Sequence, residues 1–226
     1  MRLAFISDIH GNLQALESAL KQIKADEIYC LGDIVDRYPD SNKCIELVRK
    51  YCKASVLGNH EADAIKNGFC DLEKPIKTPN ISKGEHLNPD IYREYLTAEN
   101  LSYLQNCGLE LELDDILLIH TPQDPRFLPW HYIDEETDAF LAFGKLNKKI
   151  TVIGHTHVPK IFEKIRKNAY GMKTHAIYAN DKLVVETKDD SRYMMDVGSI
   201  GYYSHEIAGH YGIIEDGRME IHRFRI

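Results

Sequence analysis

The sequence has no long apolar run, no excess of basic residues and no closely spaced pair of cysteines. No segment approaches the roughly 20 apolar residues of a membrane-spanning helix, so we expect no membrane association. The formal net charge is −7, which makes a nucleic-acid partner improbable because such partners need a basic patch. The 5 cysteines form no CxxC pair, and we identify no signal peptide. These features predict reduced thiols in a cytoplasmic protein.

The chain has the length and composition of one globular domain. Its 226 residues are 43% hydrophobic and 28% charged, which is ordinary for a chain that buries a sizeable core. There is no internal repeat, low-complexity segment or linker. We therefore expect a single domain over residues 1–226, and a homo-oligomer remains open.

The first part of the chain alternates short apolar strands with amphipathic helices. The expected strands cover residues 3–6, 27–31, 54–57, 116–119 and 150–153. The expected helices begin near Leu13, Ser41 and Glu135, where apolar residues recur at helical spacing. This alternation predicts a parallel sheet with right-handed crossovers.

Beyond Val158 the segments are short and bounded by Gly, Asn or Asp, a pattern typical of antiparallel strands. A βα part followed by an all-β part, with no linker between them, predicts an α/β fold. We expect a four-layer α-β-β-α sandwich, with two mixed sheets packed face to face and helices outside.

Residues 68–90 are rich in Pro, Lys, Asn and Gly and lack periodicity. We expect a surface excursion there that could act as a lid near the mouth of the site. Residues 91–104 return to helical spacing, which predicts a helix, in two pieces that meet near Thr97.

Polar clusters follow five of the apolar strands. They are Asp8-Ile9-His10, Gly32 to Arg37, Gly58-Asn59-His60-Glu61, His120, and Gly154-His155-Thr156-His157. Residues two apart in extended backbone point the same way, so Asp8 and His10 could converge as half of a metal site. Alternatively, Asp8 caps a helix and His10 is solvated. Five such strand ends in one chain favour the metal site.

These clusters spell the motifs DxH, GDxxDR, GNHE, a single His after a strand, and GHxH. Together they resemble the calcineurin-like metallophosphoesterase superfamily, and most closely its small bacterial and archaeal phosphodiesterase branch. The resemblance covers residues 1–160 by motif and the remainder by general layout. It implies two divalent metal ions, one held by Asp8, His10 and His157, the other by Asn59, His120 and His155, with Asp33 bridging.

The chemistry of this ligand set favours transition metals. Imidazole-rich ligation without thiolate suits Mn first, with Fe, Co, Ni or Zn as alternatives, rather than Ca or Mg. Asp8 and Asp33 are its two carboxylates, so two divalent ions would retain about two positive charges. A bridging hydroxide and a phosphate ester would neutralise that charge. The resemblance implies hydrolysis of a small-molecule phosphodiester or nucleotide-type substrate by attack of this hydroxide.

Four further residues have expected roles at the site. By resemblance, His60 is catalytic and Asp36 orients its imidazole, although His60 could instead only support the metal. Arg37 is a candidate phosphate-binding residue or a surface ion-pair residue. Asn12 is expected to cap the first helix and is a candidate substrate contact.

The sequence differs from the protein-phosphatase branch of this superfamily at two positions, and both differences bear on the substrate. The protein-phosphatase branch has glycine after the arginine of GDxxDR and arginine before GNHE, and here these positions are Tyr38 and Leu57. These differences count against a phosphoprotein phosphatase, which stays an alternative because GDxVDR and GNHE are both present. A non-catalytic metal-binding scaffold of the same fold is a further alternative. Asp196 to Gly201 lies where related phosphodiesterases have an Asn-Pro-Gly-Ser turn. We expect a tight turn near the site there.

Overall fold

The computed structural model describes residues 1–72, 93–122, 130–165, 168, 171–177, 181–201 and 208–226. Most of the expected excursion over residues 68–90 lies outside these ranges. Its first residues form the end of a helix at Gly68 and a short strand, Phe69–Asp71. Within the described ranges, no helix is both long and apolar enough to cross a membrane.

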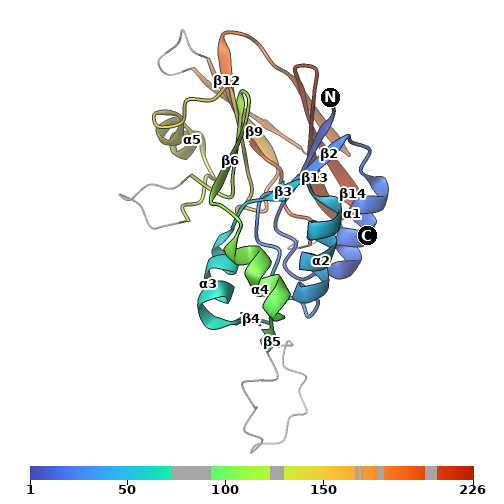
Figure 1. Cartoon of the computed structure of the whole chain (residues 1–226). Coiled ribbons are helices and arrows are strands. Elements are labelled where there is room, and N and C mark those ends of the chain that lie inside the picture. Colours follow the sequence, from blue (N-terminus) through green and yellow to red (C-terminus); the bar gives the residue numbers. More distant parts are fainter. Residues whose placement is uncertain (73–92, 123–129, 166–167, 169–170, 178–180, 202–207) are drawn as a thin grey trace, which may run out of the picture.

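Two six-stranded sheets form the centre of the molecule (Figure 1). The first has the order β11 (Lys182–Glu186), β14 (Arg218–Arg225), β13 (Ala208–Glu215), β1 (Leu3–Ile6), β2 (Glu27–Cys30) and β3 (Ala54–Ser55). The second has the order β10 (Met172–Ala176), β9 (Lys160–Ile165), β12 (Ser191–Asp196), β8 (Ile150–Ile153), β7 (Ile116–Ile119) and β6 (Glu110–Leu113). Strands β4 (Phe69–Asp71) and β5 (Arg93–Tyr95) form a separate pair.

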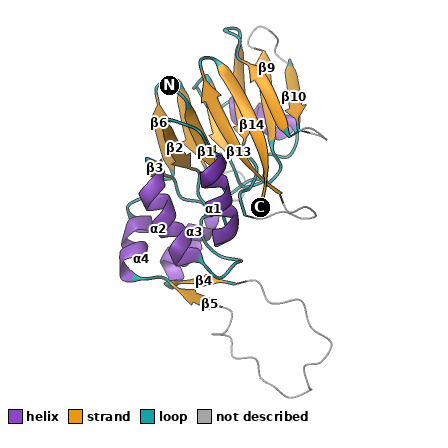
Figure 2. Ribbon diagram, turned by 90° about the vertical axis from the view of Figure 1, so that its right-hand side faces the viewer, coloured by secondary structure: helices purple, strands orange, loops and turns teal. Residues whose placement is uncertain are grey.

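Helices cover the two outer faces. They are α1 (Leu13–Gln22), α2 (Ser41–Tyr51), α3 (Asn59–Asn67), α4 (Ala98–Gln105) and α5 (Glu136–Phe143). Figure 1 shows α1 and α2 outside the first sheet and α5 outside the second, and Figure 2 shows α1 to α4 grouped together. The layers are therefore helix, sheet, sheet and helix, which confirms the predicted fold.

The alternation of side chains along β1 shows why this strand is central. Leu3 and Phe5 pack in the core between the sheets, whereas Ala4 and Ile6 pack in the core beneath α1 and α2. Successive side chains of a strand point to opposite faces, and all four are buried. A continuous apolar run is what a strand covered on both faces requires.

The parallel strands bring the polar clusters to one edge. β1 pairs in parallel with β2, and β2 with β3. In the second sheet β8 lies between β7 and β12 and is parallel to both. Because the carboxyl ends of parallel strands share an edge, the residues that follow these strands arrive close together.

One predicted helix is wrong at its start. Residues 93–95 form strand β5, and the helix begins only after Thr97, whose side chain caps it. Tertiary contacts decide this segment: Arg93 stacks on the Phe69 ring at 4.1 Å, and the Glu94 carboxylate accepts the backbone N–H of Ser41 at 2.6 Å. These contacts outweigh the helical pattern. The structure also contains α3 and β6, which the sequence pattern did not indicate.

A buried carboxylate ties together strands of the second sheet. Glu163 on β9 is 1% exposed and accepts hydrogen bonds from Lys188 Nζ and Ser191 Oγ, each at 2.9 Å, and from His175 Nε2 at 3.1 Å. Burial raises the pKa of Glu163, but the Lys188, His175 and Ser191 hydrogen bonds lower it more, to about 2. The ionised carboxylate therefore stabilises the fold.

We expect Glu163→Gln to lower the free energy of unfolding at pH 7 by about 2 kcal/mol. The pKa of Glu163 is lower in the folded state than in the unfolded state. Its stabilising effect is therefore complete above the unfolded-state pKa and is lost as the pH falls toward the folded-state pKa of about 2. The difference between variant and wild type should therefore shrink between pH 5 and pH 2. Urea unfolding of the metal-free proteins measures this, with the exposed Glu186→Gln as control. A difference that is independent of pH would contradict the assignment.

Candidate metal centre

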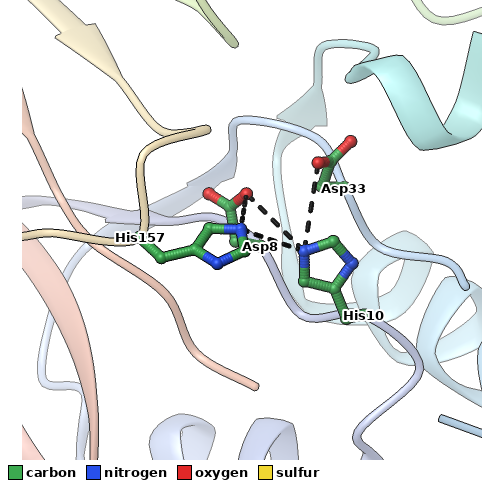
Figure 3. A group of neighbouring side chains, drawn as sticks. All are labelled: Asp8, His10, Asp33 and His157. Carbon is green, nitrogen blue, oxygen red and sulfur yellow. Dashed lines mark hydrogen bonds and ion pairs between the residues drawn. The ribbon is translucent and has the colours of Figure 1, made fainter. Parts of the chain in front are cut away.

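Four side chains from three strand ends converge on one point (Figure 3). Asp8 Oδ1 lies 3.0 Å from His157 Nε2 and 3.8 Å from His10 Nε2. The two Nε2 atoms are 3.1 Å apart, and Asp33 Oδ2 is 4.0 Å from that of His10. All four ligand atoms lie within 4.8 Å of one another. This group could hold a metal ion.

A second group shares Asp33 with the first. It consists of Asp33, His120 and His155, again with ligand atoms within 4.8 Å. Asp33 Oδ2 lies 3.2 Å from His120 Nε2. Asn59 is the first residue of α3, directly after Gly58. The structure thus brings six of the seven predicted ligands into two groups that meet at the Asp33 carboxylate.

Backbone carbonyls fix which nitrogen of each histidine faces the centre. His10 Nδ1 lies 3.3 Å from the Val35 carbonyl and His120 Nδ1 lies 2.8 Å from that of Leu31. Because a carbonyl only accepts hydrogen bonds, each Nδ1 donates and each Nε2 is turned toward the ligand group. His155 is reversed, since its Nε2 lies 3.1 Å from a backbone oxygen.

The loop before α5 supports His155. The oxygen near His155 Nε2 is the carbonyl of Trp130, and the Tyr132 ring stacks on the His155 ring with centroids 4.1 Å apart. The stacked Tyr132 ring therefore covers one face of the imidazole, and the hydrogen bond to Trp130 fixes its Nε2 edge. That leaves Nδ1 as the ligand atom.

Within the described ranges, three buried polar atoms of these residues make no hydrogen bond of acceptable geometry, although two of them lie within 3.2 Å of another ligand atom: Asp8 Oδ1, Asn59 Oδ1 and His120 Nε2. Leaving a buried polar atom unsatisfied costs about 1–3 kcal/mol. Cations bound at the two groups would satisfy all three atoms, because each atom can act as a metal ligand. The residues present therefore fit a metal centre.

The ionisation of most of these groups is consistent with this, but that of His120 is not. Burial lowers the pKa of His120, yet the Asp33 charge outweighs burial and raises it to about 10, so a metal would displace a proton from this imidazole. Burial lowers the pKa of His10 to about 3, and burial together with the nearby His120 lowers that of His155 to about 4. Both imidazoles are neutral, as ligands must be. Burial alone would raise the pKa of Asp8, but the neighbouring histidines lower it below its usual range, so this carboxylate is ionised.

Five of the predicted ligands have left-handed backbone conformations, which are uncommon for non-glycine residues. Their φ angles lie between 51° and 74°, at Asp8, His10, Asp33, His155 and His157. Asp8 and His10 therefore converge through a sharp turn rather than through the extended backbone expected from the sequence. Strained conformations of this kind persist only where the surrounding structure enforces them.

Glu61 holds the turn at Asp33 and ties it to the start of α3, a role that the motif alone did not reveal. Its buried carboxylate accepts the N–H groups of Gly58 at 2.8 Å, of Asp33 and Ile34 at 2.7 Å, and of Val35 at 3.2 Å. Burial and the Asp33 charge raise the pKa of Glu61 to about 7, while the N–H groups act in the opposite direction. The available signal was a Glu three residues after a helix N-cap.

His60 lies beside the centre and is oriented by Asp36. Its Nδ1 is 2.6 Å from Asp36 Oδ2, and its Nε2 is 3.9 Å from Asp33 Oδ2. The second Asp36 oxygen accepts the N–H of Asp71 at 2.7 Å. Burial lowers the pKa of His60, but the Asp36 hydrogen bond and the charges of Asp33 and Asp36 together raise it above its usual value. The Nε2 edge of this imidazole is turned toward the shared carboxylate.

The two candidate substrate contacts differ in their surroundings. Arg37 lines the same cavity of about 320 Å³ as Asp36 and His60. Asn12 caps α1 as predicted, since its Oδ1 accepts the N–H of Ala15 at 3.1 Å, and its Nδ2 donates to the Gly201 carbonyl at 2.9 Å. Arg37 therefore lies in a cavity beside His60, and Asn12 joins a helix to a loop.

A profile described as calcineurin-like phosphoesterase matches residues 1–159. The structure of a metallophosphoesterase from Sphaerobacter thermophilus is 30% identical, with a TM-score of 0.77 over 100% of this chain and 88% of that one. An uncharacterised protein of Methanocaldococcus jannaschii is 28% identical over 88% of this chain and 76% of its own.

A third relative carries a named activity. The symmetrical bis(5'-nucleosyl)-tetraphosphatase of Buchnera aphidicola subsp. Schizaphis graminum is 30% identical over 140 residues, which are 56% of this chain and 46% of that protein. The matched profile spans more than half of the chain and includes all seven predicted ligands. The chain therefore belongs to the calcineurin-like phosphoesterase family, a family of phosphoric ester hydrolases.

Proposed function

We propose that this phosphoesterase holds two divalent transition-metal ions, with Mn as the first candidate, and hydrolyses a small-molecule phosphodiester or nucleotide-type substrate. The observation that carries the proposal is the shared Asp33 carboxylate, which belongs to both potential ligand groups. A carboxylate between two ligand groups is how proteins place two cations a few ångströms apart. The unsatisfied ligand atoms of Asp8, Asn59 and His120 support the same assignment.

In this proposal Asp8, His10 and His157 hold one ion, Asn59, His120 and His155 hold the other, and Asp33 bridges them. When bound, the ions would supply an activated water nucleophile and positive charge opposite the phosphate. The chain itself supplies Asp8 ionised and His10 and His155 neutral, as metal ligands must be. His120, whose pKa is lowered by burial but raised by the Asp33 charge to about 10, would release a proton when a metal binds.

His60 acts as the proton donor to the leaving oxygen. Its Nδ1 is held by Asp36 at 2.6 Å, so Nε2 is the atom that faces the reacting group. The Asp36 carboxylate raises the pKa of His60, which favours the protonated form that a general acid needs. Arg37 binds a phosphate oxygen from the cavity that it shares with His60. A substrate contact by Asn12 remains a prediction.

We also propose that residues 1–226 form one domain. Strand β1, from the start of the chain, pairs with β13 in the register Leu3 to Ile214. The core between the sheets draws side chains from both, including Phe5 and Tyr193. The two ends of the sequence therefore contribute to one sheet and one core.

We expect a phosphodiester to be hydrolysed with a kcat/KM about tenfold higher than that of a monoester or a phosphopeptide. Leu57 occupies a position where the protein-phosphatase branch has arginine, so one cation is missing for a dianionic phosphoryl group. One lost charge-assisted contact is worth about 1.5–3 kcal/mol, and a monoanionic diester needs it less. The similarity to a dinucleoside tetraphosphatase makes nucleotide anhydrides the other class to assay.

The comparison uses bis(4-nitrophenyl) phosphate, 4-nitrophenyl phosphate, a dinucleoside tetraphosphate and a phosphoserine peptide with the Mn-loaded enzyme. A phosphopeptide that is turned over faster than the diester would support the phosphoprotein-phosphatase alternative. No turnover of any ester by the metal-loaded protein would support the scaffold alternative.

A further inference from the structure

Asp196 is a buried carboxylate to which the proposed function assigns no role. It ends strand β12 and is 0% exposed. Its Oδ2 accepts a hydrogen bond from Thr156 Oγ1 at 2.6 Å, and its Oδ1 accepts one from the N–H of Gly198 at 2.9 Å. Thr156 lies between His155 and His157 in the sequence. The carboxylate therefore connects the loop that carries two metal ligands to the turn that begins at Gly198.

The turn at residues 198–201 also holds Asp8, which follows the end of strand β1. Ser199 Oγ donates to the Asp8 carbonyl at 2.7 Å, and the N–H of Gly201 donates to the same oxygen at 3.0 Å. The N–H of His155 donates to Asp8 Oδ2 at 3.0 Å. These contacts close a ring of hydrogen bonds. The ring runs from Asp8 through the turn to Asp196, then to the loop that carries His155 and His157, and back to Asp8.

We propose that Asp196 and Thr156 form a positioning pair that holds the ligands of the centre at metal-binding spacing. His155 and His157 both have left-handed backbone conformations, at φ 74° and 62°, so their loop needs external contacts to stay in place. The hydroxyl of Thr156, the residue between them, donates to Asp196 and also accepts the backbone N–H of Val158 at 3.1 Å. Groups that fix ligands in this way typically contribute tenfold to hundredfold in metal affinity. The inference rests on the proposed metal assignment.

Three single substitutions isolate the hydroxyl. Thr156→Val removes it at nearly constant volume, and Thr156→Ser keeps it. Thr151→Val is the matched control, because Thr151 is a buried threonine on the preceding strand whose hydroxyl has no hydrogen-bond partner in the described part of the chain. We expect Thr156→Val to weaken Mn²⁺ binding by about tenfold or more. Thr156→Ser and Thr151→Val should stay within about threefold of wild type.

If Thr156→Val does not fold, a second pair of variants tests whether Asp196 and Thr156 position the metal ligands. The side chain in Asp196→Asn can still accept the Gly198 N–H and bond the Thr156 hydroxyl, whereas the side chain in Asp196→Ala can do neither. We expect the Asn variant to bind Mn²⁺ nearly as tightly as wild type and the Ala variant about tenfold or more weakly.

Titration of metal-free protein with Mn²⁺, with free Mn²⁺ followed by electron paramagnetic resonance, measures these affinities. Wild-type protein that binds no Mn²⁺ would remove the proposed function. Wild-type protein that binds Mn²⁺ while Thr156→Val or Asp196→Ala binds it equally well would overturn the inference alone. An equal loss in Thr151→Val would also overturn it, since any buried threonine would then matter.

Discussion

Hydrolysis is expected to fall by about a thousandfold or more when a chelator removes divalent metal, and to return with Mn, Co or Ni more completely than with Mg. Four of the seven proposed ligands are imidazoles: His10, His120, His155 and His157. Nitrogen-rich sites bind first-row transition metals more tightly than Mg, which prefers oxygen ligands and water. Without cations, the site lacks both a water activator and most of its positive charge.

Activity toward bis(4-nitrophenyl) phosphate, measured before chelation, after dialysis and after addition of each metal, tests this expectation. Thermal unfolding of the metal-free protein is the necessary control, because lost activity must not reflect lost structure. Full activity in excess chelator, or equal restoration by Mg alone, would contradict the proposed ligand set.

Replacing His60 should separate chemistry from metal binding. We expect His60→Ala to retain near-normal metal content and to reduce kcat by about a hundredfold or more, which is typical of a lost general acid or base. His155→Ala should instead lower metal content, because it removes a proposed ligand. The distances support this division, since His60 Nδ1 is bonded to Asp36 and its Nε2 lies 3.9 Å from Asp33.

Asp36→Asn should resemble a milder His60→Ala, because it only loosens the imidazole. The loss in His60→Ala should also depend on the leaving group. A nitrophenyl diester needs little protonation as it departs, so it should suffer less than an alkyl ester. Equal losses for both esters would show that His60 stabilises the phosphoryl group instead of donating a proton. If His60→Ala lost as much metal as His155→Ala, His60 would be a metal ligand or would support one.

The edge on which the site lies could be predicted from the sequence because it depends on local patterns. Apolar runs such as residues 3–6 and 150–153 mark strands, and parallel pairing brings the residues after them to one edge. Asp8, Asp33 and His155 therefore came together as expected from their places at strand ends. The packing of the sheets follows from the same alternation of buried side chains.

The supporting contacts could not be predicted, because their partners are distant in the sequence. Glu61 bonds the N–H groups of residues 33–35, which are 26 to 28 positions away. The Asp196 and Thr156 side chains are 40 positions apart. Strand β5 replaced the start of a predicted helix for the same reason, since Arg93 and Glu94 have partners in Phe69 and Ser41. The periodicity of apolar residues gives no information about contacts between such distant residues.

The central claim is that Asp33 joins two metal sites. Electron paramagnetic resonance of the protein titrated with Mn²⁺, together with metal analysis, tests it most directly. The account predicts about two Mn²⁺ per chain and a spin-coupled spectrum, because two ions that share one carboxylate lie about 4 Å or less apart. Binding of a single Mn²⁺, or of two ions whose signals are independent, would contradict the claim.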